Sequence, residues 1–207
     1  MTRTGRLIIV SNRLPVTITA NHTLVPSAGG LATALSAWHD GTSSLWIGWS
    51  GAVYTGTRED TLQSEELARR RLMSVELTAQ EVEGYYEHFS NGTLWPLCHY
   101  LLDRVPLAEH DWHTYRSVNQ KFADAVVAHY RPGDRIWVHD YHLALVPQMV
   151  RRQRPDARIG FFLHVPFPSS EVFRILPWRA ELLEGVLGAD LVGFHTYSYV
   201  RHFAMSV

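Results

Sequence analysis

The sequence predicts an α/β fold: a Rossmann-like parallel sheet with helices on both of its faces. Short apolar runs rich in β-branched and aromatic residues alternate with helical patterns, most clearly over residues 135–207. Strand, helix and strand at this spacing form right-handed βαβ units, in which the strands lie parallel. A chain of 207 residues with 46% hydrophobic residues is long enough to bury the core of one such domain.

The first part of the chain is predicted to supply two strands and a helix. Residues 7–10 are apolar and β-rich, which is typical of a strand buried on both faces, and residues 17–25 form a second extended segment. A helix follows over residues 27–38, with Ser27 as its N-terminal cap. Residues 44–51 form the next strand and run into a glycine turn.

The middle of the chain is less regular and more helical. A short charged helix is predicted at residues 64–71, inside an irregular stretch, and residues 72–77 are extended. The spacing of a capping box at residues 78–81 starts a helix, which is predicted to end at residues 91–92, an Asn-Gly pair. A longer helix is predicted over residues 112–130.

The last part of the chain repeats strand and helix three times. Strands are predicted at residues 135–139, 159–164 and 191–195. Helices are predicted over residues 142–152, interrupted or bent near Pro147, over residues 171–187, broken near Pro177, and from residue 197 onward without a stop signal.

Charge and cysteine content exclude several classes of protein. With 19 Lys and Arg against 20 Asp and Glu, the chain lacks the basic surface needed to bind nucleic acid or anionic lipid through bulk charge. The single cysteine, Cys98, forms neither an internal disulfide nor a cysteine-based zinc site and is interpreted as a buried apolar residue. No apolar run approaches the ~20 residues of a membrane span, and none suits a signal peptide. We therefore expect a cytoplasmic protein.

Polar side chains follow each predicted strand, at the edge where open parallel sheets bind ligands. Arg13 comes after the first strand, and a guanidinium there is suited to a phosphate or a carboxylate. Three later strands are followed by His139, His164 and His195. Twelve His and seven Trp in one chain also favour a carbohydrate site, because aromatic rings stack on sugars while polar groups bind hydroxyls.

Two motifs have competing interpretations. His139 and His142 have the spacing of a metal site, but a metal needs further converging ligands, and hydrogen-bonded turn histidines are the favoured interpretation. Asp140 is the better functional candidate, as an acceptor for sugar hydroxyls or as a base. The pair Gly29 and Gly30 opens a helix, which suits the approach of a phosphate, although two glycines alone also fit a plain turn.

Six sequence strings, in this order, resemble the trehalose-6-phosphate synthase family. They are IVSNRLPV at 9–16, AGGL at 28–31, WIGWSG at 46–51, YY, FSN and LWP within 85–96, WVHDYHL at 137–143, and GFFLHVPFPS at 160–169. The resemblance implies a retaining glycosyltransferase of the two-domain GT-B type. It implies transfer of glucose from a nucleotide sugar, usually UDP-glucose, to glucose 6-phosphate.

The resemblance also implies roles for individual residues. Arg13, Tyr86, Trp95 and Asp140 would bind glucose 6-phosphate, Gly29, Gly30 and His164 would bind the donor, and His164 and Asp140 would take part in catalysis. Either Trp46 or Trp49 would also line the acceptor side, and the sequence does not choose between them. The leaving phosphate of the donor would take the proton of the attacking hydroxyl, so no protein nucleophile, metal or other cofactor is implied.

The resemblance covers an acceptor-side domain over residues 1–207, open at its C-terminus and without the family's nucleotide-sugar domain. A polypeptide of this length is therefore expected to bind small molecules without transferase activity, and a homo-oligomer is compatible with the sequence. Two alternatives stay open. One is a relative with another acceptor, such as a glucosylglycerol-phosphate synthase, and the other is a non-catalytic subunit that binds sugar phosphate.

Overall fold

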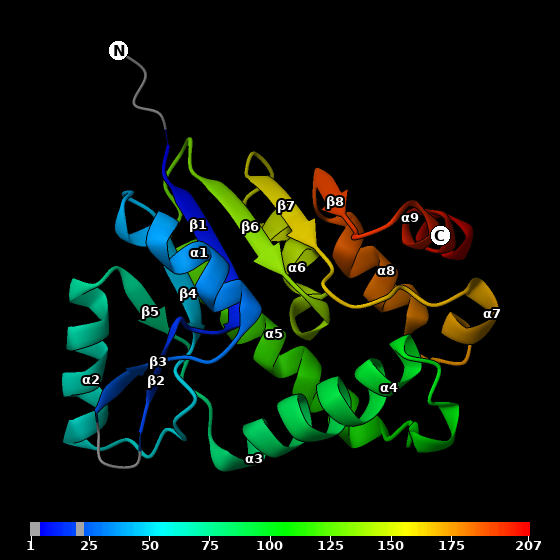
Figure 1. Cartoon of the computed structure of the whole chain (residues 1–207), viewed down its shortest axis with the longest axis horizontal. Helices are drawn as coiled ribbons and strands as arrows, with labels where there is room; N and C mark the ends of the chain where they lie inside the picture. Colours follow the sequence, from blue (N-terminus) through cyan, green and yellow to red (C-terminus); the bar gives the residue numbers. More distant parts are fainter. Residues whose placement is uncertain (1–4, 20–22) are drawn as a thin grey trace.

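A computed structural model describes residues 5–19 and 23–207. Six strands form one sheet in the order β5-β4-β1-β6-β7-β8, and every neighbouring pair in it is parallel (Figure 1). The strands are β1 (Leu7–Arg13), β4 (Leu45–Trp49), β5 (Leu72–Ser74), β6 (Arg135–His139), β7 (Arg158–Phe162) and β8 (Leu191–Gly193). The predicted fold class is confirmed.

Strand β1 is the centre of the sheet because its side chains are apolar on both faces. Ile8, Ile9 and Val10 are fully buried, with β4 on one side and β6 on the other. Such a strand has no solvent-facing side, so its position and direction in the sheet are strongly determined by burial.

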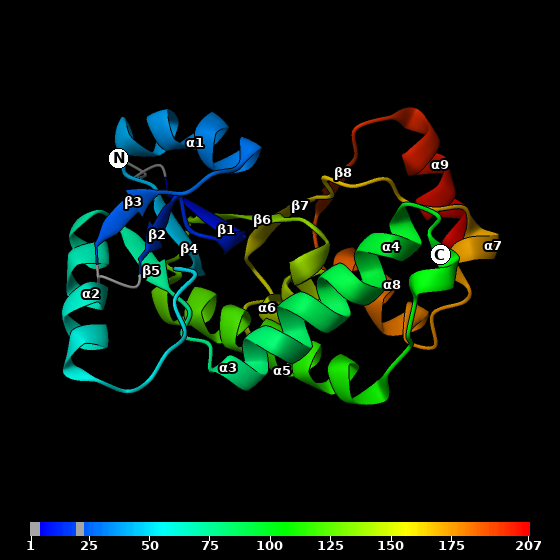
Figure 2. The same ribbon diagram turned by 60° about the horizontal axis from the view of Figure 1, so that its bottom comes forward.

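Helices cover both faces of the sheet (Figure 2). The helices α5 (Glu109–His129), α6 (Val146–Gln153) and α8 (Arg179–Leu187) contribute to a large apolar core on one side. On the other side of the sheet lies a smaller apolar cluster, which includes Ile9 and Trp46. It is covered by α1 (Gly30–Asp40), α2 (Arg58–Arg69) and a hairpin of β2 (Val16–Ile18) and β3 (Leu24–Pro26).

A long helical segment crosses the edge of the sheet at which the strands end (Figure 1). It joins α3 (Ala79–Glu81), the π-helix η1 (Val82–Leu94) and α4 (Trp95–Cys98). The predicted capping box is present, since the amide of Glu81 donates to Thr78 Oγ1 over 3.3 Å and the amide of Thr78 donates to Glu81 Oε2 over 2.9 Å. The predicted helix end at residues 91–92 is wrong, because the buried face continues beyond it to Leu94 and Leu97.

Other element boundaries also differ from the prediction. The segment 17–25 is a hairpin, of which residues 20–22 lie outside the described part of the chain. Gly29, rather than Ser27, caps α1, and Ser27 Oγ instead hydrogen-bonds Thr17 Oγ1 over 2.8 Å. The charged helix begins earlier than expected, at Arg58, after a capping box.

The C-terminal elements follow the predicted order. The segment 142–152 is interrupted near Pro147, as predicted. A short 3₁₀ turn, η3 (Tyr141–Leu143), is separate from α6, and Pro147 stands in the first turn of that helix. The predicted break at Pro177 is confirmed, since it separates α7 (Ser170–Phe173) from α8. The remaining elements are the 3₁₀ turn η2 (Leu102–Arg104) and α9 (Tyr197–Ser206). Within residues 5–19 and 23–207, no helix is long and apolar enough to cross a membrane.

Candidate functional site

Arg13 lies at the carboxyl end of β1, in a slot that is shaped around its guanidinium. The guanidinium carbon stands 4.6 Å from the centre of the Trp49 ring, and Nη2 donates a hydrogen bond to Thr17 Oγ1 over 3.2 Å. Gly51 closes the slot with a positive φ of 86°, and a Cβ at this position would lie 2.1 Å from Arg13 Nη2. Glycine is therefore favoured here by the backbone conformation, and any side chain would have to push the guanidinium of Arg13 out of the slot.

The charge of Arg13 has no counter-ion among residues 5–19 and 23–207. None of the described carboxylates forms an ion pair with it, and its Nε is buried without a hydrogen-bond partner in the described part of the chain. Burial lowers the pKa of Arg13 from 12.5, while Tyr86 acts to raise it. The side chain stays protonated at neutral pH. A half-buried, uncompensated cation is suited to an anionic ligand.

Trp49, and not Trp46, lies beside Arg13. Three positions apart on β4, the two rings are on opposite faces of the sheet. Trp49 meets the edge of Tyr86 at 5.6 Å between ring centres. Trp46 is fully buried on the other face, where its Nε1 donates to Ser11 Oγ over 2.7 Å.

Asp140 and His142 continue this group from the turn after β6. The Tyr86 ring stacks on His142 at 5.8 Å, and His142 Nδ1 stands 3.9 Å from Asp140 Oδ2. Asp140 has a φ of 76° and a ψ of 166°, a conformation that is strained for any residue other than glycine. Its Oδ1 accepts the amide of His164 over 3.1 Å. A contiguous polar and aromatic wall thus runs from Arg13 through Trp49, Tyr86 and His142 to Asp140.

The pKa values of this wall are set by burial. Burial raises the pKa of Asp140 to about 6, against the lowering effect of the amides of His164 and Tyr141 and of the charge of His195. Burial lowers the pKa of His142 to about 3. At neutral pH the wall therefore presents an arginine cation at one end and a carboxylate acceptor at the other, with a neutral imidazole beside the carboxylate.

The three predicted strand-end histidines lie together. His139 Nδ1 and His164 Nε2 are hydrogen-bonded over 3.1 Å, and the rings of His164 and His195 are 5.7 Å apart. Burial lowers the pKa of His139 to about 3, helped by the neighbouring His164, and burial also lowers the pKa of His164. No group of three or more His, Cys, Asp or Glu side chains in residues 5–19 and 23–207 could hold a metal ion.

Trp95, Gly29 and Gly30 stand outside this contiguous group. Trp95 begins α4, is 39% exposed, and stacks its ring on His99 at 4.0 Å. Gly29 and Gly30 open α1, and a Cβ on either would meet no atom within 4 Å of the described structure. At Gly29 the backbone itself favours glycine, because its φ is 158°. At Gly30 neither packing nor a positive φ requires glycine, which leaves close access to the backbone as a reason for it.

Sequence reasoning missed Thr17 and the role of Gly51 in holding Arg13. Gly51 was visible only as part of a glycine turn, and the hydroxyl of Thr17 reaches Arg13 through the β2–β3 hairpin. The favoured interpretation of His139 and His142 is a pair of hydrogen-bonded turn histidines. His139 does hydrogen-bond His164, but His142 Nδ1 is buried without a hydrogen-bond partner in the described part of the chain, and the ring packs between Tyr86 and Tyr141. Burial of the ring, not the spacing of the two histidines, determines its environment.

We expect Gly51→Ala to displace Arg13 and to weaken the binding of anionic ligands. The positive φ alone should reduce the free energy of unfolding by about 1–2 kcal/mol, and the methyl group would also occupy the place of Arg13 Nη2. Gly56→Ala is the matched control, because Gly56 also has a positive φ, of 75°, while its Cβ would meet only Tyr54 Oη, at 3.9 Å. Urea unfolding and phosphate-ester binding measure both effects. Equal binding by the two variants would contradict the role assigned to Gly51.

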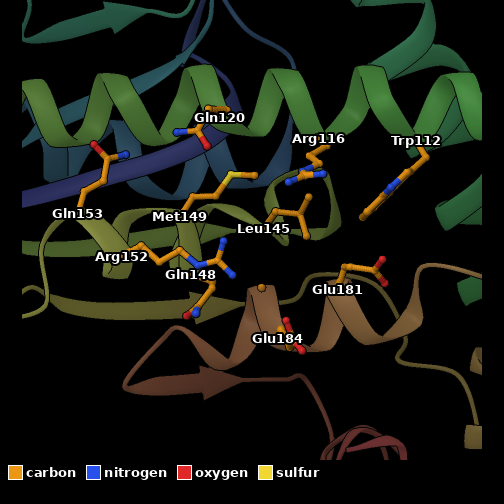
Figure 3. A pocket seen from close by; sticks show the side chains of 11 residues that line it. Trp112, Arg116, Gln120, Leu145, Gln148, Met149, Arg152, Gln153, Glu181 and Glu184 are labelled. Atoms are coloured by element: carbon orange, nitrogen blue, oxygen red, sulfur yellow. The ribbon is translucent and has the colours of Figure 1, made fainter.

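A separate groove lies between α5, α6 and α8, away from the strand ends (Figure 3). It has a volume of about 320 Å³ and contains none of the predicted site residues. Its charged side chains, which include Arg116, Arg152, Glu181 and Glu184, are exposed to solvent. The strand-end group is therefore the stronger candidate, because it combines a built slot, half-buried charges and a strained turn.

Comparison with known proteins gives a consistent family assignment. The model of glycosyltransferase family 20 matches residues 5–207. A bifunctional trehalose-6-phosphate synthase/phosphatase of Thermoproteus tenax is 48% identical over 98% of this chain, which corresponds to 29% of that protein.

Solved structures resemble this chain both in fold and in sequence. An alpha,alpha-trehalose-phosphate synthase (UDP-forming) from Burkholderia xenovorans, in complex with glucose 6-phosphate, has a TM-score of 0.79 and 36% identity over 96% of this chain and 42% of its own. A structure described as trehalose-6-phosphate from E. coli, bound with UDP-2-fluoro glucose, has a TM-score of 0.79 and 34% identity over 98% of this chain and 42% of its own. The chain spans less than half the length of these relatives.

Proposed function

Because the chain belongs to glycosyltransferase family 20, we propose that it forms the part of a trehalose-6-phosphate synthase that binds the acceptor, glucose 6-phosphate. The observation that carries this proposal is Arg13, a half-buried cation held in a slot at a strand end, with no counter-ion among the residues that the structure describes. A phosphate ester would supply the missing anion, and a guanidinium can donate two parallel hydrogen bonds to it.

The rest of the wall fits the sugar that carries this phosphate. Asp140 is ionised at neutral pH and would accept hydrogen bonds from hydroxyl groups of the acceptor, while Trp49 and Tyr86 offer aromatic surface between the two charged ends. A ligand with a phosphate at one end and hydroxyls at the other matches this order. Trp95, one helical segment away and partly exposed, would close the pocket on the acceptor side.

In the proposed reaction, the residues of this chain position the acceptor and assist the donor. Glucose 6-phosphate would be held so that its hydroxyl attacks the donor's glucose on the face that the leaving phosphate occupies, and that phosphate would take the proton. Gly29 and Gly30 would approach the diphosphate through backbone N–H groups at the start of α1, and His164 would contact the transferred glucose. The bond between the donor's glucose and its diphosphate would break as the glycosidic bond to the acceptor oxygen forms. The products would be trehalose 6-phosphate and the protonated nucleoside diphosphate, with retention at the transferred carbon.

A polypeptide of these 207 residues is expected to bind the acceptor without catalysing the transfer. Titration calorimetry should detect glucose 6-phosphate binding, while a coupled assay for UDP release from UDP-glucose should detect no turnover. The same calorimeter run with glycerol 3-phosphate tests the alternative acceptor. Preferred binding of glycerol 3-phosphate would favour the glucosylglycerol-phosphate alternative, and measurable turnover would contradict the expectation that residues outside this chain are needed.

A further inference from the structure

Two imidazole rings meet where β6 and β7 end. In the sheet register His139 is paired with Phe162, and the chain after β7 brings His164 back over the end of β6. His139 Nδ1 and His164 Nε2 are then 3.1 Å apart, which is a hydrogen-bond distance. The backbone fixes this contact from both sides, since the amide of Asp140 donates to Phe162 O over 2.8 Å and the amide of His164 donates to Asp140 Oδ1 over 3.1 Å.

A hydrogen bond between two neutral imidazoles contains one proton, so it couples the tautomers of both rings. If His139 Nδ1 carries the proton, His164 Nε2 accepts, and His164 must carry its own proton on Nδ1. If His164 Nε2 carries the proton instead, His139 must carry its own on Nε2. Both rings are neutral at neutral pH, because burial lowers the pKa of each.

The burial of His139 distinguishes these two arrangements. His139 is 1% exposed, and its Nε2 is buried without a hydrogen-bond partner in the described part of the chain. An unpaired N–H in such a place is rare and costs free energy, whereas an unpaired lone pair is better tolerated. The favoured arrangement is therefore the first one, in which His139 carries its proton on Nδ1 and has an unprotonated Nε2.

We propose that His139 is a positioning residue that donates from Nδ1 to His164 Nε2 and so holds His164 as the Nδ1–H tautomer. Only the identity of the ligand that His164 contacts rests on the proposed function. The assignment of the tautomer does not depend on it. In that setting His164 would offer an N–H donor to an oxygen of the donor sugar, with its ring orientation fixed before the ligand arrives. His139 would reach no ligand itself.

The tautomer can be read directly by NMR on the ¹⁵N-labelled 207-residue protein, without any transferase assay. Long-range ¹H–¹⁵N correlation spectra distinguish a protonated ring nitrogen from a bare one, and the spectrum of His164→Gln assigns the His164 signals by their loss. We expect His164 Nδ1 to be protonated and Nε2 to be bare at neutral pH. A protonated Nε2, or an even mixture of tautomers, in the unmodified protein would overturn the proposal.

Two amide variants of His139 then separate positioning from packing. Asparagine places its amide nitrogen near the position of Nδ1, so His139→Asn should keep the donor and the His164 tautomer. Glutamine places its amide nitrogen near the position of Nε2, so His139→Gln should lose the preference, and its His164 signals should shift toward a mixture. Both variants disturb packing, so circular dichroism should be measured for each. An unchanged His164 tautomer in folded His139→Gln would overturn the proposal, whereas weak sugar-phosphate binding by all variants would count only against the proposed function.

Discussion

Replacing Arg13 with methionine is expected to weaken binding of glucose 6-phosphate by about 100-fold, because hydrogen bonds to a charged group contribute up to about 3 kcal/mol. Methionine keeps much of the side-chain length and can still pack on Trp49, while the charge and the hydrogen bonds are lost. Arg13→Lys should give an intermediate loss of about 10-fold, since lysine keeps the charge without the planar fork. Titration calorimetry with glucose 6-phosphate measures each affinity.

The stability of Arg13→Met distinguishes a ligand-binding arginine from a structural one. Because the guanidinium has no protein counter-ion and its Nε is unpartnered in the described part of the chain, its removal should leave the free energy of unfolding unchanged or higher. Arg69→Met is the matched control, since Arg69 pairs with Glu66 on the exposed side of α2. Full affinity in Arg13→Met would contradict the proposed phosphate site.

Asp140→Asn is expected to weaken acceptor binding by about 10- to 100-fold, since a half-buried, charged hydrogen-bond acceptor becomes a neutral amide. Asparagine is the suitable replacement because it tolerates positive φ better than most residues and its oxygen can still accept the His164 amide. The same titrations with glucose 6-phosphate apply. Asp124→Asn, an exposed change on α5, is the control.

The same substitution should stabilise the protein above about pH 6. The pKa of Asp140 rises from 3.8 in the unfolded chain to about 6 in the fold. Below the unfolded pKa the group is protonated in both states and has no effect. Between the unfolded pKa of 3.8 and the folded pKa of about 6, the unfolded chain is ionised while the fold keeps the proton, so the free energy of unfolding falls. Once the pH has risen through the folded pKa, the total loss is on the order of 3 kcal/mol.

Urea unfolding across this pH range checks the sign of the effect. Asp140→Asn should exceed the unmodified protein in stability above about pH 6, and the difference should disappear near the pH at which the unfolded carboxyl is protonated. A variant that is less stable at neutral pH would show that the carboxylate is held by favourable interactions, and the burial argument would be wrong. A gain in stability together with a loss of binding would identify Asp140 as a residue retained for function.

The sheet and most residues of the candidate site could be predicted from the sequence because the signals are local. Runs such as residues 7–10 and 135–139 have the length and composition of buried strands. The rule that open parallel sheets bind ligands beyond their strand ends then selected Arg13, Asp140 and His164 without further information. The resemblance added Tyr86, which lies in the same wall.

Tertiary packing decided what the local signals left open or gave wrongly. The Asn-Gly pair at residues 91–92 is a stop signal in isolation, but burial of Leu94 and Leu97 carries the helix past it. Trp46 and Trp49 have the same sequence character, and only the faces of β4 separate them.

The contacts within the site belong to the tertiary structure as well. The register of β6 against β7 brings His139 to His164, and a hairpin brings Thr17 to Arg13. By itself, the sequence determined which residues stand at the strand ends, because that depends on short patterns read along the chain. Which of those residues touch one another was decided by the tertiary structure, because strand register and side-chain burial arise only when distant segments pack together.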